Sequence, residues 1–133
     1  MEDVLQQVLE PALRDLRIVG IRPRIEESDW AKEWDEELDR ASAMLRGRYG
    51  FRMGIAVARW WPDADQIVCV AEQVQEWAIE ELWRNGASTS WPECPHHPAA
   101  HPMDPALISD EAWWVCPHYQ STVARIGELA DLR

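Results

Sequence analysis

Residues 91–119, WPECPHHPAAHPMDPALISDEAWWVCPHY, decide how the chain is organised. This stretch holds six of the nine prolines, all four histidines and two of the three cysteines. It has few aliphatic side chains and many turn-forming residues, so it differs in kind from the sequence before it. We therefore predict an α+β fold, with a helix-plus-strand body over residues 1–88 and a Cys/His/Pro-rich, zinc-knuckle-like tail over residues 89–133.

The cysteines and histidines of this tail have the spacing of metal ligands. Cys94 and His97 are separated by two residues, as in one half of a structural zinc site, and His101 follows His97 by four positions. Cys116 begins a second Cys-Pro turn. The sequence thus predicts a structural Zn²⁺ held by Cys94, His97, His101 and Cys116. A metal-free tail with surface histidines and a disulfide between the two cysteines are the alternatives.

The fourth ligand of this predicted site is open. A symmetric two-turn site would place it at Tyr119, which is a poor zinc ligand. His118 can replace His101, and His96 can replace His97.

Two Cys-Pro turns with intervening strands resemble a zinc ribbon in which two of the four cysteines are replaced. More narrowly, residues 66–129 resemble small uncharacterised proteins of actinobacteria and their phages. The residues that carry this resemblance are Glu72–Trp77, Glu81–Trp83, Trp91, Pro92, Cys94, Pro95, His97, His101, Pro102, Trp114, Cys116, Pro117, Ile126, Gly127 and Leu129. The resemblance implies a recurring architecture and no particular activity.

The formal net charge of -11 argues against a general nucleic-acid coat, but the charges are segregated. Residues 26–39 contain eight acidic side chains, whereas residues 40–60 contain five arginines and no acid. Arg46, Arg48 and Arg52 are interleaved with glycines and aromatics, which makes them candidates for contact with single-stranded nucleic acid. The acidic run suggests the inverse alternative, a DNA mimic that blocks a DNA-binding protein.

Periodicity predicts the elements of the body and of the tail. We expect helices over 2–17 and about 64–84, with Pro11 kinking the first or starting a second one. We also expect an edge strand within 18–25, an amphipathic helix from Trp30 to Leu45, and strands over 51–60, 113–116 and 122–126.

The nine tryptophans fall into groups with different expected roles. Trp30, Trp34 and Trp77 are predicted to lie in the core, and Trp83 and Trp91 to pack the long helix against the tail. Two adjacent pairs in predicted strands point to opposite faces, so one member of each can face a partner. These candidate partner-binding residues are Trp60, Trp61, Trp113 and Trp114. Cys69 is expected to be an inert, packed thiol.

These features favour a non-enzymatic protein-binding or adaptor module stabilised by structural zinc, with another protein as its partner. A nucleic-acid-binding or DNA-mimic regulatory protein is the alternative. A small zinc hydrolase using Glu93 or Glu111 as base is less favoured, because the sequence lacks the usual hydrolase and deaminase motifs. No apolar run is long enough to span a membrane and no export signal is evident, so we expect a cytoplasmic protein.

Overall fold

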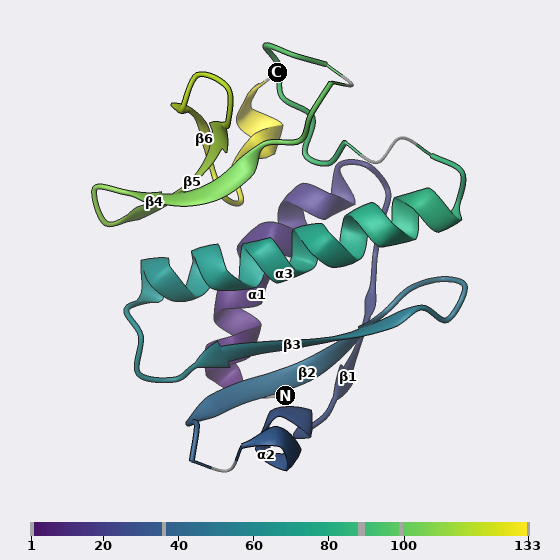
Figure 1. Ribbon diagram of the computed structural model, residues 1–133, viewed down its shortest axis with the longest axis vertical. Helices are drawn as coiled ribbons and strands as arrows, with labels where there is room; N and C mark the ends of the chain where they lie inside the picture. The colour runs from purple at the N-terminus through teal and green to yellow at the C-terminus, as the bar shows by residue number, and fades with distance from the viewer. Residues whose placement is uncertain (1, 36, 88–89, 99, 133) are drawn as a thin grey trace.

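A long helix lies between two antiparallel sheets in the computed structural model, which describes residues 2–35, 37–87, 90–98 and 100–132 (Figure 1). The predicted α+β class is confirmed. The elements are α1 (Asp3–Arg17), β1 (Arg24–Glu27), α2 (Trp30–Trp34), β2 (Arg40–Arg46), β3 (Arg52–Ala58), α3 (Asp63–Arg84), β4 (Asp104–Ile108), β5 (Glu111–Cys116), β6 (Ser121–Arg125) and a short 3-10 helix, η1 (Leu129–Leu132).

The first sheet has the order β1-β2-β3, and its strands pair antiparallel. Every second residue of β2 is buried, so one face of the sheet packs against α1 and α3. α1 runs through Pro11 as one helix. The edge strand predicted within 18–25 is wrong for most of that range, because residues 18–20 form a turn and β1 begins at Arg24, after Pro23. Proline lacks the N–H that a strand needs to donate, which delays the start of β1.

The predicted helix from Trp30 to Leu45 is wrong. α2 ends at Trp34, whose side chain is 82% exposed, and β2 follows from Arg40. The apolar positions of β2 also repeat every two residues, as in a strand with one buried face. Pairing with β3 makes the strand more stable than a helix over these residues. Trp30 lies across the other face of the sheet, where a Cβ on Gly54 would come within 2.7 Å of its indole ring.

The helix predicted over about 64–84 is confirmed as α3, and it ends at Asn85. Its core-facing residues, including Val70, Val74 and Trp77, have no exposed surface. α3 contacts β3 on one side and β4 and β5 on the other, and it also contacts α1, which crosses behind it in Figure 1. A helix covered by two sheets must bury more than a single stripe of its surface.

The second sheet has the order β4-β5-β6. The two strands predicted in the tail correspond to β5 and β6, whereas β4 was not predicted. The sequence did not predict β4 because this segment contains Pro105, and proline usually interrupts a strand. β4 lies at the edge of the sheet, where a missing N–H costs little.

The hydrophobic core is continuous from α1 to β6, although residue 88, where we predict the body to end, lies outside the described residues. Trp91 and Trp114 pack edge to face within this core, with ring centroids 5.5 Å apart. The fully buried carboxylate of Asp15 in α1 accepts hydrogen bonds from Trp114 Nε1 at 2.7 Å, from the backbone N–H of Gly127 at 2.7 Å and from that of Leu129 at 3.1 Å. A buried polar side chain therefore joins α1 to the C-terminal sheet.

Candidate metal centre

A short loop and the end of β5 supply the candidate ligands. Within the loop, the backbone N–H of His97 donates to the carbonyl of Cys94 at 3.1 Å. A bridge between Glu93 and Pro102 closes the loop and brings its two ends together. Cys116, the last residue of β5, approaches from the second sheet.

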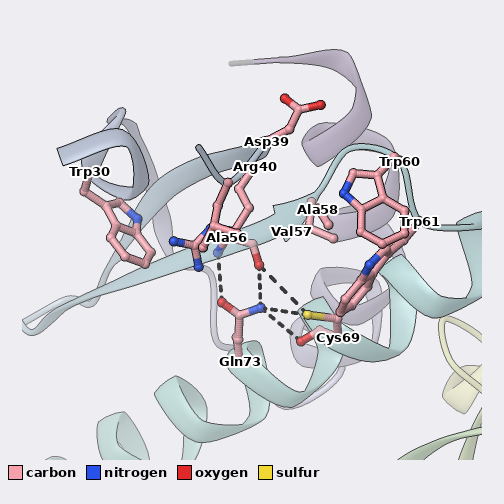
Figure 2. A pocket seen from close by; sticks show the side chains of 11 residues that line it. Trp30, Asp39, Arg40, Ala56, Val57, Ala58, Trp60, Trp61, Cys69 and Gln73 are labelled. Atoms are coloured by element: carbon pink, nitrogen blue, oxygen red, sulfur yellow. Dashed lines mark hydrogen bonds between the residues drawn. The ribbon is translucent and has the colours of Figure 1, made fainter. Parts of the chain in front are cut away.

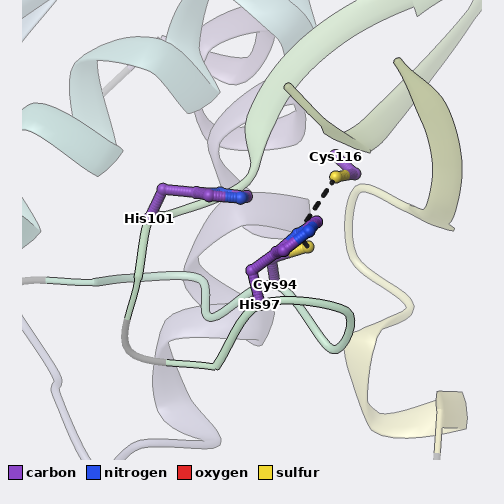
Figure 3. A group of neighbouring side chains, drawn as sticks. All are labelled: Cys94, His97, His101 and Cys116. Atoms are coloured by element: carbon purple, nitrogen blue, oxygen red, sulfur yellow. Dashed lines mark hydrogen bonds between the residues drawn. The ribbon is translucent and has the colours of Figure 1, made fainter. Parts of the chain in front are cut away.

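The four predicted ligands converge on one point (Figure 3). One donor atom from each of Cys94, His97, His101 and Cys116 lies within 4.8 Å of all the others. His97 Nδ1 is 3.7 Å from Cys94 Sγ and 3.6 Å from Cys116 Sγ. With Zn–S of about 2.3 Å and Zn–N of about 2.0 Å, neighbouring ligand atoms of a tetrahedral site are about 3.5 Å apart. These side chains are therefore close enough together to hold a metal ion.

His101 carries the most specific evidence for a metal. Its Nδ1 lies 3.2 Å from the carbonyl oxygen of Pro102. A carbonyl only accepts, so this hydrogen bond requires the proton on Nδ1, and in the neutral ring Nε2 then presents a lone pair. Nε2 is buried and has no hydrogen-bond partner among the residues that the structure describes. A metal ligand needs this tautomer, fixed by a hydrogen bond to a backbone carbonyl.

The pKa of the Cys116 thiol is lowered by its surroundings. Burial alone would raise the pKa of its thiol, but hydrogen bonds from the Tyr119 backbone, from Cys94 and from the His118 backbone outweigh burial and lower the pKa below its usual value. The Tyr119 N–H lies 3.5 Å from Sγ. The pKa of His97 is also lowered, by burial first and then by the charges of His101, His118 and His96. Both shifts favour the protonation states that bind metals.

The alternative ligands surround this centre but are not part of it. His96 and His118 are exposed, and their rings pack against Tyr119 with centroids 6.1 Å and 5.0 Å away. His118 also lies edge to face with His97, with centroids 5.2 Å apart. The structure thus brings His101, rather than His118, together with the other three candidates.

The four candidate partner-binding tryptophans differ in how far they are exposed. Trp60 and Trp61 follow the end of β3 and are 74% and 37% exposed, so they do not extend the strand as predicted. Trp114 is fully buried, and Trp113 on the opposite face of β5 is half-buried. Only the first pair therefore forms an exposed aromatic surface.

Three other predicted tryptophan positions need correction. Trp30 is half-buried on the other face of the first sheet and is not part of the core. Trp34 lies outside the core, as described above, and Trp83 is 65% exposed and does not pack α3 against the tail. Trp77 and Trp91 are buried as predicted. Helical spacing alone did not separate the buried tryptophans from the exposed ones.

The arginines proposed for nucleic-acid contact are largely engaged within the protein. Glu26 of β1 forms ion pairs with Arg46 at 3.5 Å and with Arg52 at 3.0 Å. Arg48 is exposed and lies over the Tyr49 ring, 5.8 Å from its centroid. The acidic and basic segments thus partly neutralise each other, since β1 and the β2–β3 hairpin are adjacent.

The sequence did not predict two contacts that the structure shows. They are the contact of His101 with the Pro102 carbonyl at the candidate metal centre and the hydrogen bonds of Asp15 in the core. The Pro102 carbonyl has no side-chain signature, and the hydrogen bonds of Asp15 join residues 99 to 114 positions apart. A lone acidic residue within the apolar face of a predicted helix was the available signal for Asp15.

No known protein-family model matches this chain, and searches of curated proteins and of solved structures found no significant match either. None of the helices formed by the described residues is long and apolar enough to cross a membrane.

Proposed function

We propose that this chain is a non-enzymatic protein-binding module whose C-terminal sheet is stabilised by a structural Zn²⁺. The observation that carries the proposal is the unpartnered Nε2 of His101 among three further soft or borderline donors. Zn²⁺ suits a set of two cysteines and two histidines in tetrahedral arrangement. A cytoplasmic location is consistent with this reading, because a reducing compartment keeps Cys94 and Cys116 as thiols.

A structural role is favoured over hydrolysis. Four protein donors fill a tetrahedral site, whereas catalytic zinc keeps a position for water or substrate. Of the two candidate bases, Glu111 forms an ion pair with Arg125 at 3.0 Å. Glu93 is exposed, and its backbone takes part in the bridge that closes the loop.

The exposed Trp60–Trp61 pair supports protein binding. Large aromatic side chains that stay exposed are common anchors of protein interfaces. The nucleic-acid alternative is weaker, because Glu26 already pairs with two of its three arginines.

Metal content tests the proposal directly. We expect the purified native protein to contain one zinc per chain, measured by inductively coupled plasma mass spectrometry. Cys94→Ser and Cys116→Ser should each lose most of it, because the thiolates are the strongest ligands. Cys69→Ser is the matched control, since Cys69 lies outside the cluster and should leave zinc at one equivalent. A metal-free native protein, or Cys→Ser variants that keep their zinc, would contradict the proposal.

The fourth ligand can be tested in the same way. His101→Ala should weaken zinc binding by at least about a hundredfold, measured by chelator competition, because even a group that only orients a ligand contributes about tenfold to a hundredfold. His118→Ala should change it little, because His118 lies exposed beside the centre. If His118→Ala instead weakened zinc binding more than His101→Ala, His118 would be the ligand.

A further inference from the structure

A pocket of about 410 Å³ lies between β3, α3 and the segment that leads into β2 (Figure 2). Trp30 and Arg40 lie at one end of it, and Trp60 and Trp61 lie at the other. The volume falls within the range of small-ligand pockets. The pocket therefore extends beneath the tryptophans to which we assign partner binding.

The aromatic wall formed by Trp30 is held in place by hydrogen bonds. Trp30 Nε1 donates to the carbonyls of Ala43 and Ile55 at 2.9 and 3.2 Å. The rings of Trp60 and Trp61 lie at 89° with centroids 6.1 Å apart, so one presents a face where the other presents an edge. This arrangement suits a planar ring packed against the indoles.

The buried polar side-chain atoms that line the pocket, with one exception, have partners among the described residues. Gln73 Nε2 donates to the Ala56 carbonyl at 2.8 Å, and Gln73 Oε1 accepts from the Ala56 N–H at 2.8 Å. The Asp39 carboxylate accepts from Arg59 Nη1 at 2.6 Å. Burial raises the pKa of the Cys69 thiol, an effect that Glu72 reinforces and Gln73 opposes, so Cys69 stays neutral.

The exception is Arg40. Its Nε is buried without a hydrogen-bond partner, and its guanidinium forms no ion pair with any residue that the structure describes. An unpaired cation with a desolvated N–H favours an anionic group in its vicinity. The pocket thus combines aromatic walls with one positive charge that forms no ion pair within the described part of the chain.

We propose that this pocket binds the C-terminal aromatic residue of a partner polypeptide. Its ring would pack against the indoles, and its free α-carboxylate would pair with Arg40. A terminal aromatic residue carries both groups within one residue, which matches a pocket of this size. The inference rests on the proposed protein-binding function and names the part of the partner that is recognised.

The test uses the zinc-loaded full chain and two peptides that differ in one group. The probe is acetyl-Gly-Ser-Gly-Phe with a free carboxylate, and its control is the same peptide as the C-terminal amide. Binding is measured by calorimetry and by the indole N–H signals of Trp30, Trp60 and Trp61 in ¹H–¹⁵N spectra. We expect the carboxylate to bind at least about tenfold more tightly than the amide, because a charge-assisted hydrogen bond is lost in the amide.

Variants assign the effect to Arg40. Arg40→Gln should remove the tenfold preference for the carboxylate and leave binding of the amide unchanged. Arg46→Gln is the matched control, since Arg46 lies on the same strand but is exposed outside the pocket. Trp61→Leu should weaken both peptides, which tests the aromatic wall if Arg40→Gln fails to fold.

Three outcomes would overturn the inference. Equal binding of the two peptides, or a preference that survives Arg40→Gln, would remove the role of Arg40. N-acetylphenylalanine bound as tightly as the peptide would identify a free small molecule as the ligand. Because zinc content is measured separately, absence of peptide binding by a zinc-loaded protein would reject this pocket and leave the structural-zinc proposal intact.

Discussion

The two sheets on either side of α3 are attached to it in different ways. The first sheet buries small and aliphatic residues that alternate along its strands, such as Ala43, Leu45 and Ile55. The second sheet has fewer of them and is joined by polar contacts. Gln75 of α3 donates to the carbonyls of Trp91 and Met103, and Asp15 of α1 holds the residues that follow β6. A sheet poor in aliphatic residues gains most from such fixed links and from a metal.

Removing the metal should produce the largest difference in local stability between the two sheets. Chelation of the proposed zinc should lower the local stability of β5 and β6 by at least about 3 kcal/mol, because Zn²⁺ contributes roughly 10–16 kcal/mol to the folding of zinc-finger peptides. Amide hydrogen exchange should then accelerate by about a hundredfold or more in β5 and β6 and change little in β2 and β3. Equal loss of protection in both sheets would show that they unfold as one unit.

Replacing Asp15 should have the next largest effect. Asp15→Ala removes the acceptor for the indole N–H of Trp114 and for two backbone N–H groups, all in a buried position. We expect a loss of about 3 kcal/mol in the free energy of unfolding, measured by urea denaturation, with the second sheet losing protection first. Glu128→Ala is the control. Glu128 is exposed and lies between Gly127 and Leu129, so its replacement should change the free energy of unfolding little.

The pH dependence of Asp15 provides a separate check. Burial raises the pKa of its carboxyl above the ordinary 3.8, although hydrogen bonds from Trp114, Gly127 and Leu129 oppose the shift. As pH rises from 3.8 through the raised native pKa, the unfolded chain ionises before the folded one, so the native protein loses stability relative to Asp15→Ala. Paired denaturation curves at several pH values measure this difference. If the stability of the native protein relative to Asp15→Ala instead increased with pH, the pKa of Asp15 in the folded protein would be lowered rather than raised.

Sequence patterns predicted the parts of the molecule that depend on local or spacing signals. α3 has a long periodic pattern and a clear stop at Asn85, and the Cys/His spacing predicted the four side chains that converge. The pattern from Trp30 to Leu45 failed because its apolar positions fit both a helix and a strand. Pairing with β3, which lies beyond the intervening turn, decided between them.

Contacts between distant residues were outside the reach of the sequence. Two partners of Asp15, Gly127 and Leu129, follow β6, and Arg40 became notable only because no residue that the structure describes forms an ion pair with it. The exposure of Trp60 depends on where β3 ends. Such features follow from tertiary packing, which periodicity does not record.

A glycine in the hairpin of the first sheet should be nearly as sensitive as a core residue. A Cβ on Gly47 would lie 2.1 Å from Glu81 Oε2, and Glu81 is only 2% exposed. Its Oε1 accepts from the Arg48 N–H at 3.2 Å, which ties the hairpin to α3. Gly47→Ala should cost about 1–3 kcal/mol by thermal denaturation. Gly50→Ala is a comparison with a different cause of cost, because nothing lies near a Cβ there and only its positive φ opposes the change. A cost of Gly47→Ala that stays the same in a Glu81→Ala background would remove the role of Glu81.

The smallest effects should come from the ion pairs at the outer surfaces of the two sheets. Arg52 pairs with Glu26 at 3.0 Å on the first sheet, and Arg125 pairs with Glu111 at 3.0 Å on the second. Arg52→Gln and Arg125→Gln should each cost less than about 1 kcal/mol, because exposed charges are well solvated and screened by salt. Urea denaturation at low and high salt measures both, and the two costs should shrink together as salt rises. A larger, salt-insensitive cost for Arg125→Gln alone would mean that the second sheet also depends on its surface charges. In that case the links through Asp15, Gln75 and the cysteine–histidine cluster would not account for its attachment to α3.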